Sequence, residues 1–256
     1  RKRSRHNKVV VQSGRSRFSL ASLPAADFPS VQRDKSSFSV TVPQKEFGEL
    51  IHKTAFSMAQ QDVRYYLNGM LWELTEQNLR AVATDGHRLA IADVHLTKPS
   101  SQAQQQIIVP RKGVLELARL LTDDDESATI DLEFSANHIR AAAGDLVFVS
   151  KLVDGKFPDY KRVLPKGGDK KVLADRQDLK AALSRTAILS NEKFRGVRFM
   201  LESGTVGVQA NNPEQEEASE EISVDYQGDS LEMGFNVSYL IDVLGVLSAD
   251  SISITL

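Results

Sequence analysis

The sequence predicts an α+β fold made of repeated domains, each with two helices among mainly antiparallel strands. Three pairs of similar segments reveal the repeat: 14–18 with 144–148, 27–29 with 156–158, and 114–121 with 240–247. The members of these pairs start 130, 129 and 126 positions apart. A period of about 130 residues matches a whole domain and is too long for a solenoid unit.

The first expected elements are two strands, 9–11 and 17–20, around a turn at Gly14. The next copy begins with an alternating strand at 38–42, and Pro43 then opens a helix that runs to about Met58. The rest of this copy is expected as strands at 68–74, 79–84, 88–95 and 106–109, a helix from Pro110 to about 121, and strands at 129–134, 138–142 and 146–152.

The last copy has the same expected order. Its elements are a strand at 171–174, a helix at 178–189, strands at 197–202, 205–210 and 221–226, a helix at 237–247 and a strand at 251–256. Polar residues 32–37 and the Pro-Gly-containing segment 165–168 mark boundaries. We therefore expect an incomplete domain at 1–37, a complete domain at 38–168, and a third domain at 169–256 that lacks its C-terminal strands.

The composition is typical of a soluble globular protein, with 41% hydrophobic and 26% charged residues. No run of about 18 apolar residues is present, so no membrane partner is expected. Cysteine is absent, which excludes disulfides, zinc ribbons and thiol catalysis. A cytoplasmic location is the natural expectation.

Charge is unevenly distributed, although the net charge is only −2. Residues 1–17 carry seven Lys and Arg and no acid, whereas residues 214–233 carry eight acids and no base. Opposite charges at two ends of a chain favour head-to-tail association. Such an assembly closes into a ring if the rotation between successive subunits allows it. The alternative is a basic tail and a solvated acidic loop without partners.

Seven strings carry a resemblance to a known family, and the third of them is Ala83-Thr-Asp-Gly-His-Arg-Leu89. They span 13–19, 61–69, 83–89, 109–113, 150–160, 188–196 and 211–217. Together they resemble the bacterial replicative sliding clamp, the beta subunit of DNA polymerase III. They occur in the family's order over nearly the whole chain.

The resemblance implies processivity-fold domains in which helices line a hole around duplex DNA and sheets form the outer wall. Two subunits of three such domains would associate head to tail in a homodimeric ring. The implied function is non-catalytic: the clamp holds the DNA polymerase III catalytic subunit on double-stranded DNA without regard to sequence. Implied partners are an ATP-driven clamp loader and other clamp-motif proteins of replication and repair. No cofactor is expected, and no P-loop is present.

Two segments are candidates for contact with DNA. Arg can meet a phosphate while Tyr stacks on bases or caps the backbone, and cations at the start of a helix suggest a nearby anion. Packing of the two tyrosines against the sheet, and a solvated helix start, are the alternatives. The matching family positions are Gln61, Arg64, Tyr65, Tyr66, Arg111 and Lys112. Lys53, Lys180 and Arg185 are further candidate helix-face charges.

The resemblance also implies a groove for partner peptides between domains two and three. It would accept a short motif of Gln followed by Leu and Phe, with arginine stems as walls. For Thr84 and Val163, the alternative remains open that these residues only close the contact between the domains. The matching residues are Leu67, Thr84, Gly86, His87, Arg88, Leu89, Pro158, Arg162 and Val163.

The ring-closing edges follow from the same resemblance. Arg15, Arg17 and Phe18 match the edge of the first domain. The edge of the third domain is matched by Ile188, Leu189, Glu214, Glu216 and Glu217. The charges are complementary, and the apolar residues could bury one another.

Two other functions stay open. The chain could be a clamp fragment that binds peptides without encircling DNA. It could also be a small hydrolase with Asp85 and His87 as an acid–base pair and Thr54 or Ser57 as nucleophile. A tight turn at Asp85-Gly86 explains the same residues without catalysis.

Overall fold

The computed structural model describes residues 8–28, 38–100, 105–121 and 127–256. The chain forms two compact units, Arg1–Ser37 and Phe38–Leu256. The first unit contains the antiparallel hairpin of β1 (Lys8–Ser13) and β2 (Ser16–Ala21), followed by the short helix η1 (Ala25–Asp27). Gly14 occupies the turn with φ of +56°, a conformation that costs glycine little. The basic residues among 1–7 lie outside the described residues.

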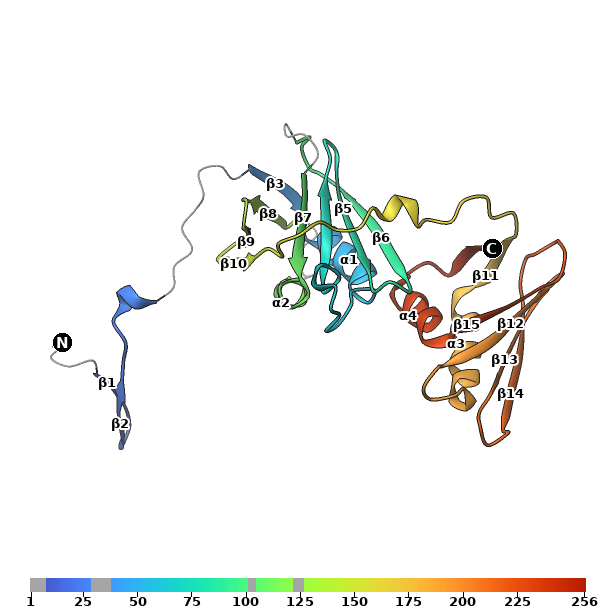
Figure 1. The fold of residues 1–256 in the computed structure, drawn as a ribbon. Coiled ribbons are helices and arrows are strands. Elements are labelled where there is room, and N and C mark those ends of the chain that lie inside the picture. Colours follow the sequence, from blue (N-terminus) through green and yellow to red (C-terminus); the bar gives the residue numbers. More distant parts are fainter. Residues whose placement is uncertain (1–7, 29–37, 101–104, 122–126) are drawn as a thin grey trace. The chain divides into compact units, whose positions relative to one another are not determined.

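The second unit opens with a repeat that contains two four-stranded antiparallel sheets, in the orders β6-β5-β4-β7 and β10-β9-β8-β3 (Figure 1). The two helices pack between them: Phe47 and Leu117 share one core with Trp72 and Leu132, which come from different sheets. The elements are β3 (Phe38–Pro43), α1 (Gln44–Ala55), η2 (Tyr65–Leu67), β4 (Gly69–Leu74), β5 (Asn78–Thr84), β6 (Leu89–His95), β7 (Gln105–Pro110), α2 (Arg111–Leu120), β8 (Thr129–Phe134), β9 (His138–Ala143) and β10 (Leu146–Lys151).

The rest of the unit repeats this order of elements around a separate core. Counting the domains expected from the sequence, we call residues 38–168 the second repeat and residues 169–256 the third repeat. Its sheets have the orders β14-β13-β12-β15 and β11-β16, which correspond to β6-β5-β4-β7 and β3-β8. The elements are β11 (Lys171–Asp175), α3 (Arg176–Thr186), η4 (Ala187–Leu189), β12 (Gly196–Glu202), β13 (Thr205–Asn211), β14 (Glu217–Ser223), β15 (Leu231–Asn236), α4 (Val237–Val246) and β16 (Ser251–Thr255). The predicted α+β fold of repeated domains is confirmed.

Local chemistry explains where the helices begin. Proline precedes α1 and α2, with φ of −61° at Pro43 and −62° at Pro110, so the entry angle is preset. The side chain of Asp175 accepts a hydrogen bond from the amide of Asp178 at the start of α3, and Asn236 accepts one from the amide of Ser238 at the start of α4. The predicted helix start at Asp178 is therefore two residues late.

Two strand predictions were wrong. The strand expected at 221–226 begins at Glu217 and ends at Ser223, because Asp225 leaves it to bridge to Leu173 in β11. Strand β15 was missed, although Leu231, Met233 and Phe235 alternate with polar or small residues in the pattern of a half-buried strand. Within the described residues, no helix is both long and apolar enough to span a membrane.

Residues 152–170, here called the connector, join the two repeats. The amide of Val153 donates to the carbonyl of Ile108 in β7, and the connector then forms the short helix η3 (Tyr160–Arg162). Phe157 and Tyr160 are buried with Leu71 of the sheet in a small outer cluster. The connector therefore covers the face of the β6-β5-β4-β7 sheet that points away from the main core.

Candidate functional site

The first candidate region is the loop between α1 and η2. Gln61 is held at φ of +58°, and the next residue is fixed by Asn68: the amide of Asp62 donates to Asn68 Oδ1 at 2.9 Å, and Asn68 Nδ2 donates to Asp62 O at 2.8 Å. Tyr65 is more than half exposed and meets Tyr66 edge-on, with centroids 5.7 Å apart. The loop therefore presents one accessible aromatic ring on a firm base.

Arg64 is also exposed, but its guanidinium is engaged in hydrogen bonds. Its Nε and Nη2 donate to the two carboxylate oxygens of Asp62 at 3.0 and 2.8 Å, and Nη2 also donates to Asp85 O at 3.2 Å. The side-chain bonds from Arg64, and then a bond from its backbone amide at 2.7 Å, lower the pKa of Asp62 from 3.8 to about 2, and the Asp62 carboxylate raises the pKa of Arg64. This pairing was not predicted from the sequence, and it reduces the positive charge that Arg64 can offer an anion.

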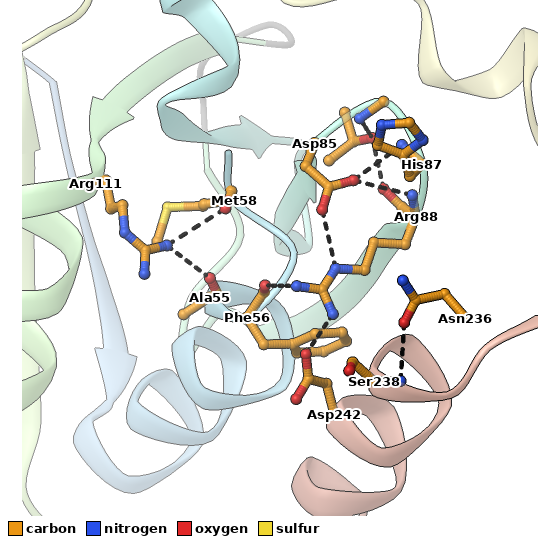
Figure 2. Close-up of polar contacts among 12 residues, drawn as sticks. Ala55, Phe56, Met58, Asp85, His87, Arg88, Arg111, Asn236, Ser238 and Asp242 are labelled. Carbon is orange, nitrogen blue, oxygen red and sulfur yellow. Dashed lines mark hydrogen bonds and ion pairs between the residues drawn. The ribbon is translucent and has the colours of Figure 1, made fainter. Parts of the chain in front are cut away.

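A shallow hollow of about 500 Å³ lies beside this loop at the start of α2. Arg111 Nη1 donates to the carbonyls of Ala55 and Met58 at 3.4 Å, so its guanidinium caps the end of α1 (Figure 2). Lys112 is exposed, as is Arg119, which pairs with Glu116. The lining residues are Ala59, Gln60, Gln61, Asn68, Arg111, Lys112, Leu115, Glu116 and Arg119.

The hollow thus brings together three residues that the sequence placed in two separate segments: Gln61, Arg111 and Lys112. Backbone N–H groups at a helix start and surrounding cations suit an anion such as phosphate. Arg64, Tyr65 and Tyr66 do not line it. Of the other candidate helix charges, Lys53 pairs with Glu49, and Arg185 pairs with Glu220.

The turn between β5 and β6 is the second candidate region. Gly86 has φ of +90°, and Asp85 Oδ1 accepts hydrogen bonds from the amides of His87 and Arg88. The hydroxyl of Thr84 donates to Arg88 O at 2.6 Å, so Thr84 serves the turn itself. Aspartate and glycine at these positions are typical of a tight turn.

Arg88 joins the two repeats through this turn (Figure 2). Its guanidinium donates to Asp85 Oδ2 at 3.1 Å, to Phe56 O at 2.9 Å, and to Asp242 on α4. It also lies over the rings of Phe56 and Tyr239, at 5.3 and 4.7 Å from their centroids. The charged head expected at a groove rim is thus engaged in the contact between repeats, a role the sequence could not show for Arg88.

The remaining groove residues divide between the sheet and the connector. Leu67 is buried and Leu89 half-buried in the cluster that contains Phe157 and Tyr160. Pro158, Arg162 and Val163 are exposed on the connector. The structure therefore places an apolar floor beside exposed connector residues.

The two ring edges lie in different units and are described separately. On the hairpin, Arg15, Arg17 and Phe18 are all exposed, with 58% of Phe18 accessible. In the third repeat, 76% of Ile188 is accessible and Leu189 is partly buried. Glu214, Glu216 and Glu217 are exposed before or at the start of edge strand β14.

The residues of the hydrolase alternative are used for other purposes. The Asp85 carboxylate is bound by two amides and by Arg88, and the His87 ring stacks on Tyr239 at 6.3 Å. Thr54 and Ser57 have no exposed surface, so no substrate can reach either hydroxyl. Among the described residues, no group of three or more metal-ligand side chains gathers.

Comparison with known proteins gives one family. The model of the DNA polymerase III beta subunit central domain matches residues 41–159, and that of its C-terminal domain matches residues 161–256. The beta sliding clamp of Pseudomonas putida is 59% identical over 250 residues, which cover 97% of this chain and 67% of that protein. The beta sliding clamp of Pseudomonas aeruginosa is 58% identical over 250 residues, which cover 98% and 67%.

A solved structure of the same family has a similar fold. The crystal structure of the DNA polymerase III subunit beta from Pseudomonas aeruginosa superposes with a TM-score of 0.93 at 56% sequence identity. That match covers 99% of this chain and 69% of the other chain. The chain thus spans about two thirds of the length of these relatives.

Proposed function

This chain belongs to the family of bacterial beta sliding clamps, the beta subunits of DNA polymerase III, and from that membership we propose how its surfaces act. The protein is a DNA sliding clamp, a non-catalytic processivity factor. It encircles duplex DNA as a head-to-tail homodimer and tethers the replicative polymerase, so that the polymerase stays on its template. We assign 1–37 to the end of the first clamp domain, 38–168 to the second and 169–256 to the third.

The hollow at the start of α2 is the observation that supports DNA contact best. Its cations and side-chain amides can meet phosphates without reading bases, as sliding requires. We assign direct contact to Gln61, Lys112 and the exposed Tyr65, while Arg111 contributes charge from its capping position. Arg64 is exposed but paired with Asp62, so it would offer DNA a reduced positive charge, and Tyr66 supports Tyr65.

Partner proteins would bind beside the connector. The apolar floor at Leu67 and Leu89 can take the Leu and Phe of a peptide motif, with Pro158, Arg162 and Val163 along one side. Thr84, Gly86, His87 and Arg88 form the turn that supports this floor. The occupants would be the DNA polymerase III catalytic subunit, the clamp loader and other clamp-motif proteins of replication and repair, in the bacterial cytoplasm.

Ring closure would join the hairpin of one subunit to the third repeat of the next. Phe18 can bury against Ile188 and Leu189, and Arg15 and Arg17 can pair with Glu214, Glu216 and Glu217. These ion pairs would lie at the rim of an apolar contact, where salt screens them.

Light scattering at 50 mM and 500 mM NaCl tests the ring. We expect twice the chain's mass at low salt and a shift toward monomer at high salt. The Arg17→Glu variant should remain monomeric at low salt, whereas the control Lys98→Glu, on an exposed loop, should dimerise normally. A monomer at every salt concentration, together with peptide binding, would instead support the alternative of a peptide-binding fragment.

A further inference from the structure

The connector alternates buried anchors with exposed residues. Phe157 and Tyr160 are only 6% and 4% exposed, whereas Pro158, Arg162 and Val163 lie on the surface between or after them. The exposed residues are the ones assigned to one side of the partner groove. Any shift of the two anchors would therefore move that side of the groove.

A row of four polar residues crosses the sheet beneath the connector. Glu73 on β4 lies directly opposite Gln106 on β7 and Arg80 on β5, and Arg80 lies opposite Asp93 on β6. Gln106 Nε2 donates to Glu73 Oε1 at 3.1 Å. Arg80 donates to both carboxylate oxygens of Asp93 at 2.7 and 3.0 Å.

Glu73 is buried, with 2% of its surface exposed, although it belongs to the outward face of the sheet. A buried carboxylate is costly unless hydrogen bonds compensate it. The connector supplies such a bond: the hydroxyl of Tyr160 donates to Glu73 Oε2 at 2.6 Å.

The same hydroxyl accepts a hydrogen bond from Arg80 Nη1 at 3.3 Å. Tyr160 is thus held by residues of two neighbouring strands. A tyrosine phenol is protonated at neutral pH and can donate to Glu73, and burial raises the pKa of this phenol further. Asp93 in turn fixes the guanidinium of Arg80 and raises its pKa. The pairing of strands therefore defines where the hydroxyl must lie.

We propose that Tyr160 is a positioning residue for the partner groove: its bond to Glu73 sets the register of the connector on the sheet and so places Pro158, Arg162 and Val163. This role rests on the proposed peptide groove. Apolar contacts alone are non-directional, so Phe157 would hold the connector down without fixing its position along the sheet. Lys161 also pairs with Glu73, but at 3.9 Å and from an exposed side chain, so this ion pair is looser than the 2.6 Å bond from Tyr160. The ion pair of Arg162 with Asp159 lies within the connector and is highly exposed, so it adds little.

The test uses Tyr160→Phe in the whole chain, with two readouts. The first is the affinity of a fluorescein-labelled peptide that carries Gln followed by Leu and Phe, measured by anisotropy. The second is hydrogen exchange at the amides of Arg162 and Val163, which donate to Asp159 O and Tyr160 O. We expect peptide affinity to fall and exchange to rise, each by about tenfold, the size of one lost charge-assisted hydrogen bond.

Three variants separate positioning from general stability. Gln106→Ala removes a donor to Glu73 that lies outside the connector, so affinity should stay within about twofold while the thermal midpoint falls. Glu73→Met should reproduce the loss seen in Tyr160→Phe. Glu73→Gln keeps an acceptor for the phenol of Tyr160 and should therefore retain most of the peptide affinity that Glu73→Met loses.

Unchanged affinity and exchange in Tyr160→Phe would overturn the proposal. Equal losses in Gln106→Ala and Tyr160→Phe would also overturn it, because general destabilisation would then explain both. If the unmodified chain fails to bind the peptide, the proposed groove is wrong. Exchange at the two amides then still decides whether Tyr160 fixes the connector.

Discussion

Replacing Arg88 with Met should loosen the contact between the two repeats and destabilise the second repeat. The guanidinium of Arg88 has three acceptors, two in its own repeat and Asp242 in the next. Methionine keeps much of the apolar stem and removes the charge. The matched variant Asp242→Asn removes only the charge that comes from α4.

The size of the effect follows from exposure. The side chain of Arg88 is 20% exposed and that of Asp85 19%, so their bond and the bond to Phe56 O are largely shielded from water. Charge-assisted bonds contribute about 1.5–3 kcal/mol each when shielded, but they share one side chain, so Arg88→Met should cost about 3 kcal/mol in total. Asp242 is 44% exposed, and after discounting for solvent its loss should cost about 0.5–1 kcal/mol.

The assay uses the single tryptophan of the chain. Trp72 is 1% exposed in the core of the second repeat, edge-on to Phe47 at 5.2 Å, so its fluorescence reports unfolding of that repeat. Urea midpoints of both variants should fall below that of the unmodified protein, and Arg88→Met should fall further.

The double variant gives the decisive comparison. Because Asp242 acts through Arg88, Asp242→Asn should have no further effect once Arg88 is Met. If Arg88→Met leaves the Trp72 transition unchanged, the guanidinium does not make these bonds in solution. If the two effects add, Asp242 stabilises the protein by some other contact.

Two further predictions concern the loop and turn beside this contact. The carboxyl of Asp62 should titrate near pH 2 by carbon NMR, and Arg64→Leu should return the pKa of Asp62 toward 3.8. Because the pKa of Asp62 is lower in the folded state, the stability that this pair adds is present above about pH 4 and is lost as pH falls toward 2. An unchanged Asp62 pKa in Arg64→Leu would show that the pair does not form. Gly86→Ala should destabilise the protein more than Gly204→Ala in urea unfolding. Both glycines have similar φ (+90° and +83°), but only at position 86 would a new Cβ lie 2.9 Å from the Arg64 guanidinium. Equal losses of stability would mean that backbone strain alone sets the effect.

Much of the fold was predictable because its signals are local. Alternating strands, prolines before α1 and α2, and the repeat of about 130 residues are all properties of short segments or of their spacing. Strand β15 carries the same local signal, because Leu231, Met233 and Phe235 alternate with polar or small residues, but it was not predicted.

The sequence by itself determined the repeated α+β domains and, through its motifs, the candidate surfaces, since both depend on residue types at fixed spacing. Only the tertiary structure decided what each charged side chain does. Arg111 caps α1, Arg64 pairs with Asp62, and Arg88 reaches Asp242, 154 positions away. The physical reason is that a guanidinium binds whichever acceptors the fold brings within hydrogen-bonding distance, and chain spacing does not encode that distance.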